Sequence, residues 1–295
     1  MSLVVNHNLM AANSSRYLNT HYKALSDSTR KLSSGLRVET AADDAAGLAI
    51  RELMRAEIST LNQGVRNAND GISLIQTADG ALQVVDEKLI RMKELAEQAA
   101  TGTYDSTQRL IIDSEYQQMA SEITRIANAT DFNGIKLLDG NLSSDTHDGT
   151  GLVSTGKLKI HFGTANDSAE DYYYIQIGDS TASALGVGNA NGGGAGHDIS
   201  TQANAQKALD AINNAIVSKD NIRAHLGALQ NRLENTITNL EVQSENLQSA
   251  ESQISDVDVA TEMTNFVRNQ ILTQSAVSML GQANSLPQMA LSLIG

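Results

Sequence analysis

The chain has 295 residues and is 41% hydrophobic but only 3% aromatic, with no tryptophan and no cysteine. A chain that is rich in Leu, Ile, Val, Met and Ala but poor in aromatic residues suits thin seams between helices rather than a thick globular core. The absence of cysteine excludes disulfides, thiolate metal sites and thiol nucleophiles. A formal net charge of −13 with no basic patch argues against a nucleic-acid partner, because phosphate contacts require clustered Lys and Arg.

Apolar residues recur every seven positions at the start of the chain. This register predicts a helix over about residues 6–34 with a coiled-coil seam, formed by Val4, Ala11, Leu18, Leu25 and Leu32. A second run of the same spacing, from Leu61 to Ala96, predicts a helix of about fifty residues, far beyond the ~11–12 typical of globular domains. A shorter helix is expected over residues 105–129, before the Phe132-Asn133-Gly134 turn.

The middle of the chain changes period. Apolar residues alternate in 157–162 and again in 172–177, which predicts an antiparallel β-hairpin within about residues 132–180. Helical patterning returns near Thr201 and becomes strictly heptad from Leu226 to Ile254, so a helix is expected over 222–255. A final helix carries Val259, Met263, Phe266, Val277 and Leu280, and the only proline, Pro287, is expected to end it.

These elements predict a mainly α fold: a long antiparallel helix bundle or coiled-coil rod with a small β-hairpin region, and with the N- and C-terminal helices paired. Both ends of the chain lack charge, since no Asp, Glu, Lys or Arg precedes Arg16 or follows Arg268. Helices without charged faces are commonly buried against partners. We therefore expect the ends to be mobile in the monomer and to fold on assembly. Polar residues interrupt 269–295 too often for a membrane helix, so no membrane insertion is predicted.

Five stretches of the chain resemble bacterial flagellins. Residues 31–50, KLSSGLRVETAADDAAGLAI, resemble the family's N-terminal signature, with Glu39-Thr40-Ala41 in place of the more usual Asn-Ser-Ala. The other matches are NANDGISLIQ at 67–76, FNGIKLLDG at 132–140, RAHLGALQNRL at 223–233 and the uncharged C-terminal tail. The resemblance covers about the first 140 and the last 95 residues in the family's order.

The resemblance implies a structural subunit that polymerises into the flagellar filament for swimming. Residues 1–42 and 256–295 would form the inner tube, and 43–255 would form a rod domain. The segment 141–200 is too short for a large outer domain. The N-terminus shows no conventional cleaved signal, in keeping with export in unfolded form by the flagellar type III apparatus to an extracellular filament. Implied partners are other copies of the chain, the filament cap, hook-junction proteins and an export chaperone at the C-terminal segment.

The family resemblance also implies a contact with a host innate immune receptor. The family's receptor-contacting pattern RxxELxxQ matches Arg91, Leu95 and Gln98, and its glutamate on the following helix matches Glu115. The alternative is that these four residues only pack one rod against another.

No enzyme, metal or cofactor site is predicted. Asp43 and Asp44 are adjacent, and adjacent helical positions do not face one another, so they are interpreted as helix-start acids. The six histidines show no metal-ligand spacing, and neither a P-loop nor a nucleophile elbow is present. A hook–filament junction protein and a soluble coiled-coil adaptor remain alternatives to the filament subunit.

Overall fold

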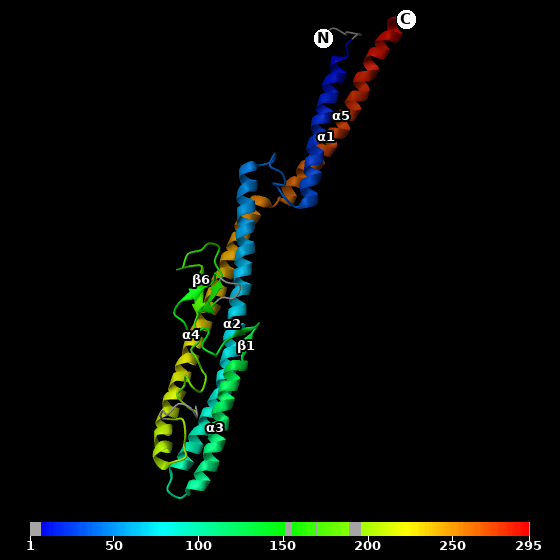
Figure 1. Cartoon of the computed structure of the whole chain (residues 1–295). Helices are drawn as coiled ribbons and strands as arrows, with labels where there is room; N and C mark the ends of the chain where they lie inside the picture. Colours follow the sequence, from blue (N-terminus) through cyan, green and yellow to red (C-terminus); the bar gives the residue numbers. More distant parts are fainter. Residues whose placement is uncertain (1–6, 151–154, 169, 189–195, 295) are drawn as a thin grey trace. The chain divides into compact units, whose positions relative to one another are not determined.

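The structure, a computed structural model, describes residues 7–150, 155–168, 170–188 and 196–294. Five helices contain most of the chain: α1 Leu9–Ser34, α2 Ala45–Ala100, α3 Ser106–Ala129, α4 Gln202–Ser255 and α5 Val259–Ile294. The mainly α class, the paired terminal helices and the small antiparallel strand pairs are confirmed (Figure 1). The chain divides into two compact units, residues 1–58 with 245–295 and residues 59–244. The predicted domain limits at 42/43 and 255/256 stay predictions.

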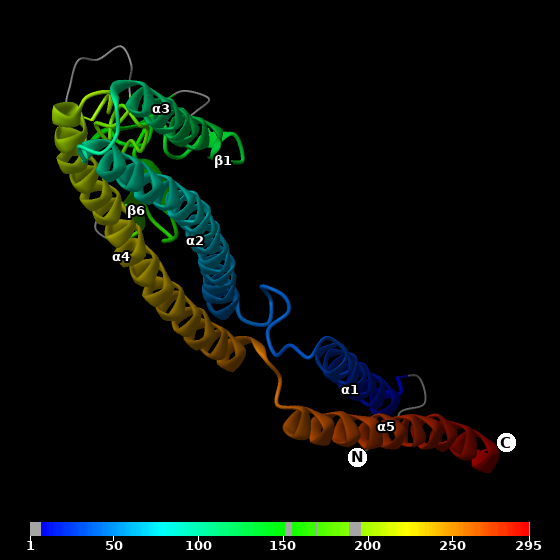
Figure 2. The same cartoon turned by 90° about the horizontal axis from the view of Figure 1, so that it is seen from below.

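In the first unit, α1 and α5 lie side by side in antiparallel directions (Figure 2). Asn8, before α1, contacts Ala283 near the end of α5, whereas Leu36, beyond α1, forms a β-bridge with Asp256, just before α5. Between α1 and the bridge the chain turns at Gly35, whose left-handed φ of 73° closes the helix with a 2.9 Å bond from its N–H to the carbonyl of Lys31. Glycine adopts this conformation without the steric penalty of a Cβ.

In the second unit, α3 and α4 both run antiparallel to α2. The 101–105 turn places α3 antiparallel to α2, and α4 runs antiparallel to α2, with Asp86 opposite Lys219 and Asp79 opposite Arg223. One apolar cluster joins the end of α2, α3 and the start of α4, and a second joins the middle of α2 to α4 through the strand region.

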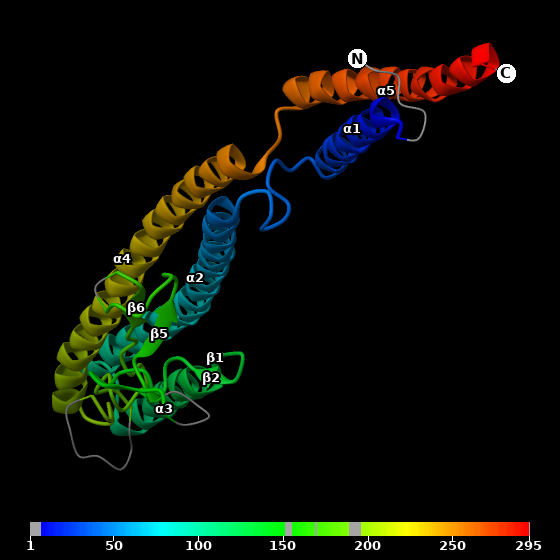
Figure 3. The same cartoon turned by 90° about the horizontal axis from the view of Figure 1, so that it is seen from above.

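The predicted hairpin is present as β5 Leu158–His161 and β6 Tyr172–Ile175 (Figure 3). The alternation was interpreted correctly, since Phe162, Ile175 and Ile177 are buried. The sequence interpretation missed two further two-residue pairs, β1 Asp131–Phe132 with β2 Ile135–Lys136, and β3 His147–Asp148 with β4 Thr155–Gly156. Their strands are too short to show any period. β1 and β2 are joined by Asn133-Gly134, both at positive φ, which is a typical hairpin turn.

Two predicted helix limits were wrong. α4 begins at Gln202 rather than near 222. Its first half packs small residues, such as Ala205 and Ala208, into the first apolar cluster, so it has no strict leucine heptad. The last helix does not stop at Pro287, because α5 continues to Ile294.

Candidate assembly surface

The terminal helices bury little of their apolar surface against each other. On α1, Ala11, Leu18, Leu25 and Leu32 are half-buried, and Ser28 is the only fully buried side chain in that helix. On α5, Phe266 and Leu280 are half-buried. Val4, the remaining predicted seam residue of the first helix, lies outside the described residues. One thin seam therefore holds the pair together.

The other predicted seam residues of α5 face solvent. Val259, Met263 and Val277 are 58%, 44% and 54% exposed. Together with three neighbours they form what we call the α5 apolar surface: Val259, Met263, Val267, Ile271, Val277 and Met279. Because Phe266 and Leu280 lie on the seam side of the same helix, α5 is apolar on more than one face. A helix of this kind requires more than one partner.

More than half of the exposed large hydrophobic side chains in the described part of the chain lie on α1 and α5. A groove of about 540 Å³ runs between the two helices and is lined by Met10, Tyr17, Leu272 and Met279 among others. Exposed apolar patches of this extent mark interaction sites. No described helix of the chain is long and apolar enough to cross a membrane.

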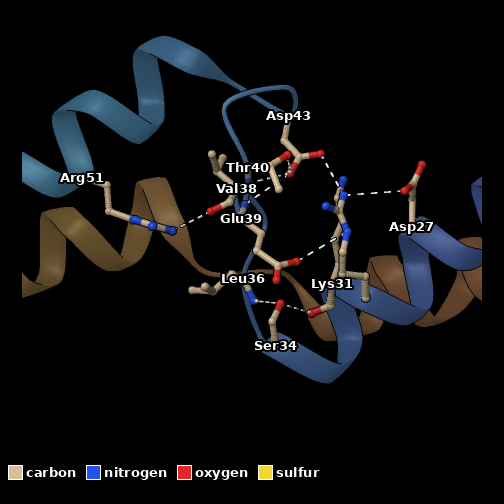
Figure 4. A network of polar contacts seen from close by, with 10 residues as sticks. Asp27, Lys31, Ser34, Leu36, Val38, Glu39, Thr40, Asp43 and Arg51 are labelled. Carbon is tan, nitrogen blue, oxygen red and sulfur yellow. Dashed lines mark hydrogen bonds and ion pairs between the residues drawn. The ribbon is translucent and has the colours of Figure 1, made fainter.

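An arginine-centred network organises the segment between α1 and α2 (Figure 4). Arg30 reaches three carboxylates, at 3.1 Å from Asp43, 3.5 Å from Glu39 and 3.6 Å from Asp27. The backbone N–H and hydroxyl of Thr40, both donating to Asp43, lower the pKa of that carboxyl to about 2, with Arg30 adding to the effect. Asp44 instead accepts the N–H of Gly47 at 2.9 Å, which caps the start of α2.

Two further arginines bind backbone carbonyls in this unit. Arg51, whose side chain is 8% exposed, donates to the carbonyl of Val38 at 2.6 Å and pairs with Glu52 at 2.7 Å. Arg37 donates to the carbonyl of Ile254 at 2.6 Å. The sequence interpretation did not single out any of the three arginines. A usable signal was present, because Arg30, Arg37 and Arg51 lie in or beside the 31–50 stretch that resembles the family signature.

In the second unit the structure joins two of the four residues predicted to contact an immune receptor, Arg91 and Glu115. The guanidinium of Arg91, on α2, donates to Glu115 of α3 at 2.7 Å, and this bond raises the pKa of Arg91. Gln98 is exposed and donates to the hydroxyl of Tyr104. Leu95 is 1% exposed and lies inside the first apolar cluster.

A second polar feature in this unit also escaped the sequence interpretation. Lys219, on α4, is 1% exposed and pairs with Asp86 of α2 at 2.5 Å and with Asp220 at 2.7 Å. One turn away, Arg223 binds Asp79 at 2.7 Å, which lowers the pKa of that carboxyl. Within the described ranges no group of three or more His, Asp or Glu side chains is placed to hold a metal ion.

The chain matches two family models that account for most of its length. The bacterial flagellin N-terminal helical region matches residues 5–143, and the bacterial flagellin C-terminal helical region matches 209–294. The chain belongs to the bacterial flagellin family. This flagellin is therefore a structural protein and not an enzyme.

Curated relatives match nearly all of this flagellin. It is 44% identical to a flagellin of Halalkalibacterium halodurans over 99% of this chain and 100% of that one. It is 41% identical to the flagellar filament 33 kDa core protein of Treponema phagedenis, with the same coverage. A structure titled a putative flagellar hook-associated protein, from Vibrio parahaemolyticus, has a TM-score of 0.55 at 15% identity, covering 72% of this flagellin and all of that chain, which shows a shared fold only.

Proposed function

We propose that this flagellin polymerises into the flagellar filament through α1 and α5, and that the residues of the predicted assembly seams are its contacts. Six of these residues, typified by Leu18 and Phe266, pair the two helices within one chain. Three others, Val259, Met263 and Val277, belong to the α5 apolar surface and contact neighbouring copies. The observation that carries the proposal is the exposure of Val259, Met263 and Val277 on a helix that has no charge after Arg268.

Elementary energetics supports this division. Full burial of a Val or Met side chain stabilises by about 1.5–3 kcal/mol, and in one chain the α5 apolar surface does not realise this gain. Contacts between copies realise it for every subunit added. The ends, residues 1–42 and 256–295, would line the inner tube, while 43–255 would form the rod around it, with the filament outside the cell.

Further partners follow from the same assignment. An uncharged, apolar C-terminal segment is a suitable substrate for an export chaperone before assembly, and the subunit would travel unfolded through the flagellar type III apparatus. The hook-junction proteins would contact the first subunits of the filament, and the filament cap would contact the last ones. The Arg91–Glu115 pair and Gln98 form an exposed polar face suited to a host receptor.

Electron microscopy after seeded assembly tests the central proposal. We expect long fibres from the full chain and only monomers from a chain truncated after Arg268. A point variant sharpens the test: Val277→Asp should abolish fibres, whereas Val217→Asp, at an equally exposed valine of α4 (59%), should not. One small fixed oligomer for every variant would contradict the filament subunit and favour the junction or adaptor function.

Receptor contact requires a control for the ion pair. Arg91→Glu breaks the bond to Glu115 and reverses the contact charge. The exchange variant, Arg91→Glu with Glu115→Arg, restores an ion pair but not the original charges toward a receptor. Loss of receptor signalling in both variants supports the contact. Normal signalling by the exchange variant contradicts it and leaves these residues a structural role.

A further inference from the structure

The side chain of Asn8 joins the start of α1 to the last part of α5. Its backbone carbonyl accepts the N–H of Ala12 at 3.0 Å, and its Oδ1 accepts the N–H of Ala11 at 3.0 Å, so Asn8 caps α1. Its Nδ2 donates to the carbonyl of Ala283, 275 positions along the chain, at 2.8 Å. One amide therefore caps one helix and binds the backbone of the other.

The carbonyl that Asn8 binds is unusual for a helix interior. In an α-helix, the carbonyl of a residue accepts the N–H of the residue four positions later, which for Ala283 is residue 287. Residue 287 is the only proline of the chain and has no N–H. Ala283 is 5% exposed, so little water can replace the missing donor. A buried carbonyl without a donor is unfavourable, and here Asn8 supplies that donor.

We propose that Asn8 is a positioning residue, which binds the carbonyl freed by Pro287 and thereby fixes the register of α1 against α5. The cap that Asn8 forms on α1 does not depend on α5. The bond from its Nδ2 to the carbonyl of Ala283 does, because it forms only when the two residues are aligned. The inference also gives a reason for α5 to continue beyond Pro287, because the hydrogen bond lost inside the helix is replaced from outside it.

The seam alone does not select this alignment. Its apolar residues on α1 repeat every seven positions from Ala11 to Leu32, so a slip of one heptad again places apolar residues at the seam. Ion pairs do not exclude this slip at the end of the pair where Asn8 meets Ala283, because neither helix carries a charged side chain there. At the opposite end of the pair, the backbone bridge between Leu36 and Asp256 aligns the end of α1 with the start of α5. At the uncharged end, the pairing of Asn8 with the single proline-freed carbonyl is the contact that distinguishes the alignment. Its consequence for filament formation rests on the proposed assembly through α1 and α5.

A double-mutant cycle tests the proposal. Asn8→Asp keeps an oxygen that caps α1, and its charge favours a helix start, but it has no N–H to donate to Ala283. Loss of that bond should raise the critical concentration for fibre formation about tenfold. Pro287→Ala restores the N–H at 287, so Asn8→Asp in this background should change the critical concentration less than about twofold. Asn19→Asp, the same change at an exposed position of α1, is the control and should have little effect.

A second measurement reports register directly. The chain has no cysteine, so spin labels on Asn19→Cys and Gln270→Cys give one distance within a chain diluted in unlabelled filament. We expect one narrow distance for the unmutated chain. For Asn8→Asp we expect a second, longer distance from chains in which α1 has slipped along α5 by one heptad, about 10 Å of helix rise. Equal effects of Asn8→Asp in both backgrounds, with one unshifted distance, would overturn the register proposal alone. Absence of fibres from the unmutated chain would instead contradict the proposed function.

Discussion

Buried polar residues in this flagellin hold elements together at single points. Lys219 is the clearest case, because a fully buried ammonium reaches Asp86 across the α2–α4 contact. Removing one partner of a buried pair leaves the other charge uncompensated, whereas replacing both with apolar groups is often neutral.

Removing one partner of a fully buried ion pair typically costs about 3–5 kcal/mol. Asp86 retains some exposure to water, so we expect the smaller loss of about 2–4 kcal/mol in the stability of the second unit for Lys219→Met. The double variant Lys219→Met with Asp86→Leu should recover most of that loss. Urea unfolding of the monomer, followed by circular dichroism, measures both. A double variant as unstable as the single one would show that the ammonium has a further role.

The carboxyl of Asp43 makes the α1–α2 connection sensitive to acid. Its pKa in the folded chain is about 2, below the ordinary 3.8, because Thr40 and Arg30 bind the charged form. Its stabilising contribution is therefore present above pH 3.8 and is lost as pH falls through about 2. Protection of the Thr40 amide against exchange with deuterium, measured relative to the intrinsic exchange rate at each pH, should therefore fall over that window in the native chain. Asp43→Asn should remove this pH dependence, and an unchanged profile would contradict the assignment.

At the scale of elements, the seven-residue period was sufficient to predict that the long helices exist, but not where α4 begins. Residues such as Leu61, Leu82 and Leu233 are buried in the second unit, as their register requires. The period carried no information on Arg51, whose partner is a backbone carbonyl, or on Asn8, whose partner is 275 positions away. It also gave no account of how α5 passes Pro287, since the replacement donor comes from another element. Contacts of this kind depend on tertiary structure, which local patterns do not contain.

Two glycines inside α2 offer a matched test of element packing. A Cβ at Gly64 would lie 2.0 Å from the carbonyl oxygen of Phe162, beside the β5–β6 hairpin, whereas nothing lies within 4 Å of a Cβ at Gly80. Gly80→Ala should stabilise the second unit by about 0.5–1 kcal/mol, because alanine has the higher helix propensity. Gly64→Ala should destabilise it and displace the hairpin. Thermal unfolding of the two variants compares them, and equal shifts of the same sign would contradict the close approach.

At the scale of the whole molecule, burial differs sharply between the two units. The residues of α2, α3 and α4 supply two extended apolar clusters. By contrast, Ser28 is the only fully buried side chain of α1, and Ala283 is the one described for α5. The family resemblance predicted the filament function and its order of segments. It did not predict this imbalance, because burial depends on which side chains meet in the folded chain.

The imbalance predicts where the monomer is ordered. Fixing one residue of backbone costs about 1–2 kcal/mol of conformational entropy. The thin seam between α1 and α5 offsets little of that cost, whereas contacts between copies in the filament offset more of it. Backbone amides of α1 and α5 should therefore exchange quickly in the monomer and become protected in the filament, with those of α2 and α4 between residues 59 and 244 protected in both. Hydrogen exchange read by mass spectrometry measures this. Strong protection of both terminal helices in the monomer would show that they fold before assembly, and ordering of the ends would then not be coupled to polymerisation.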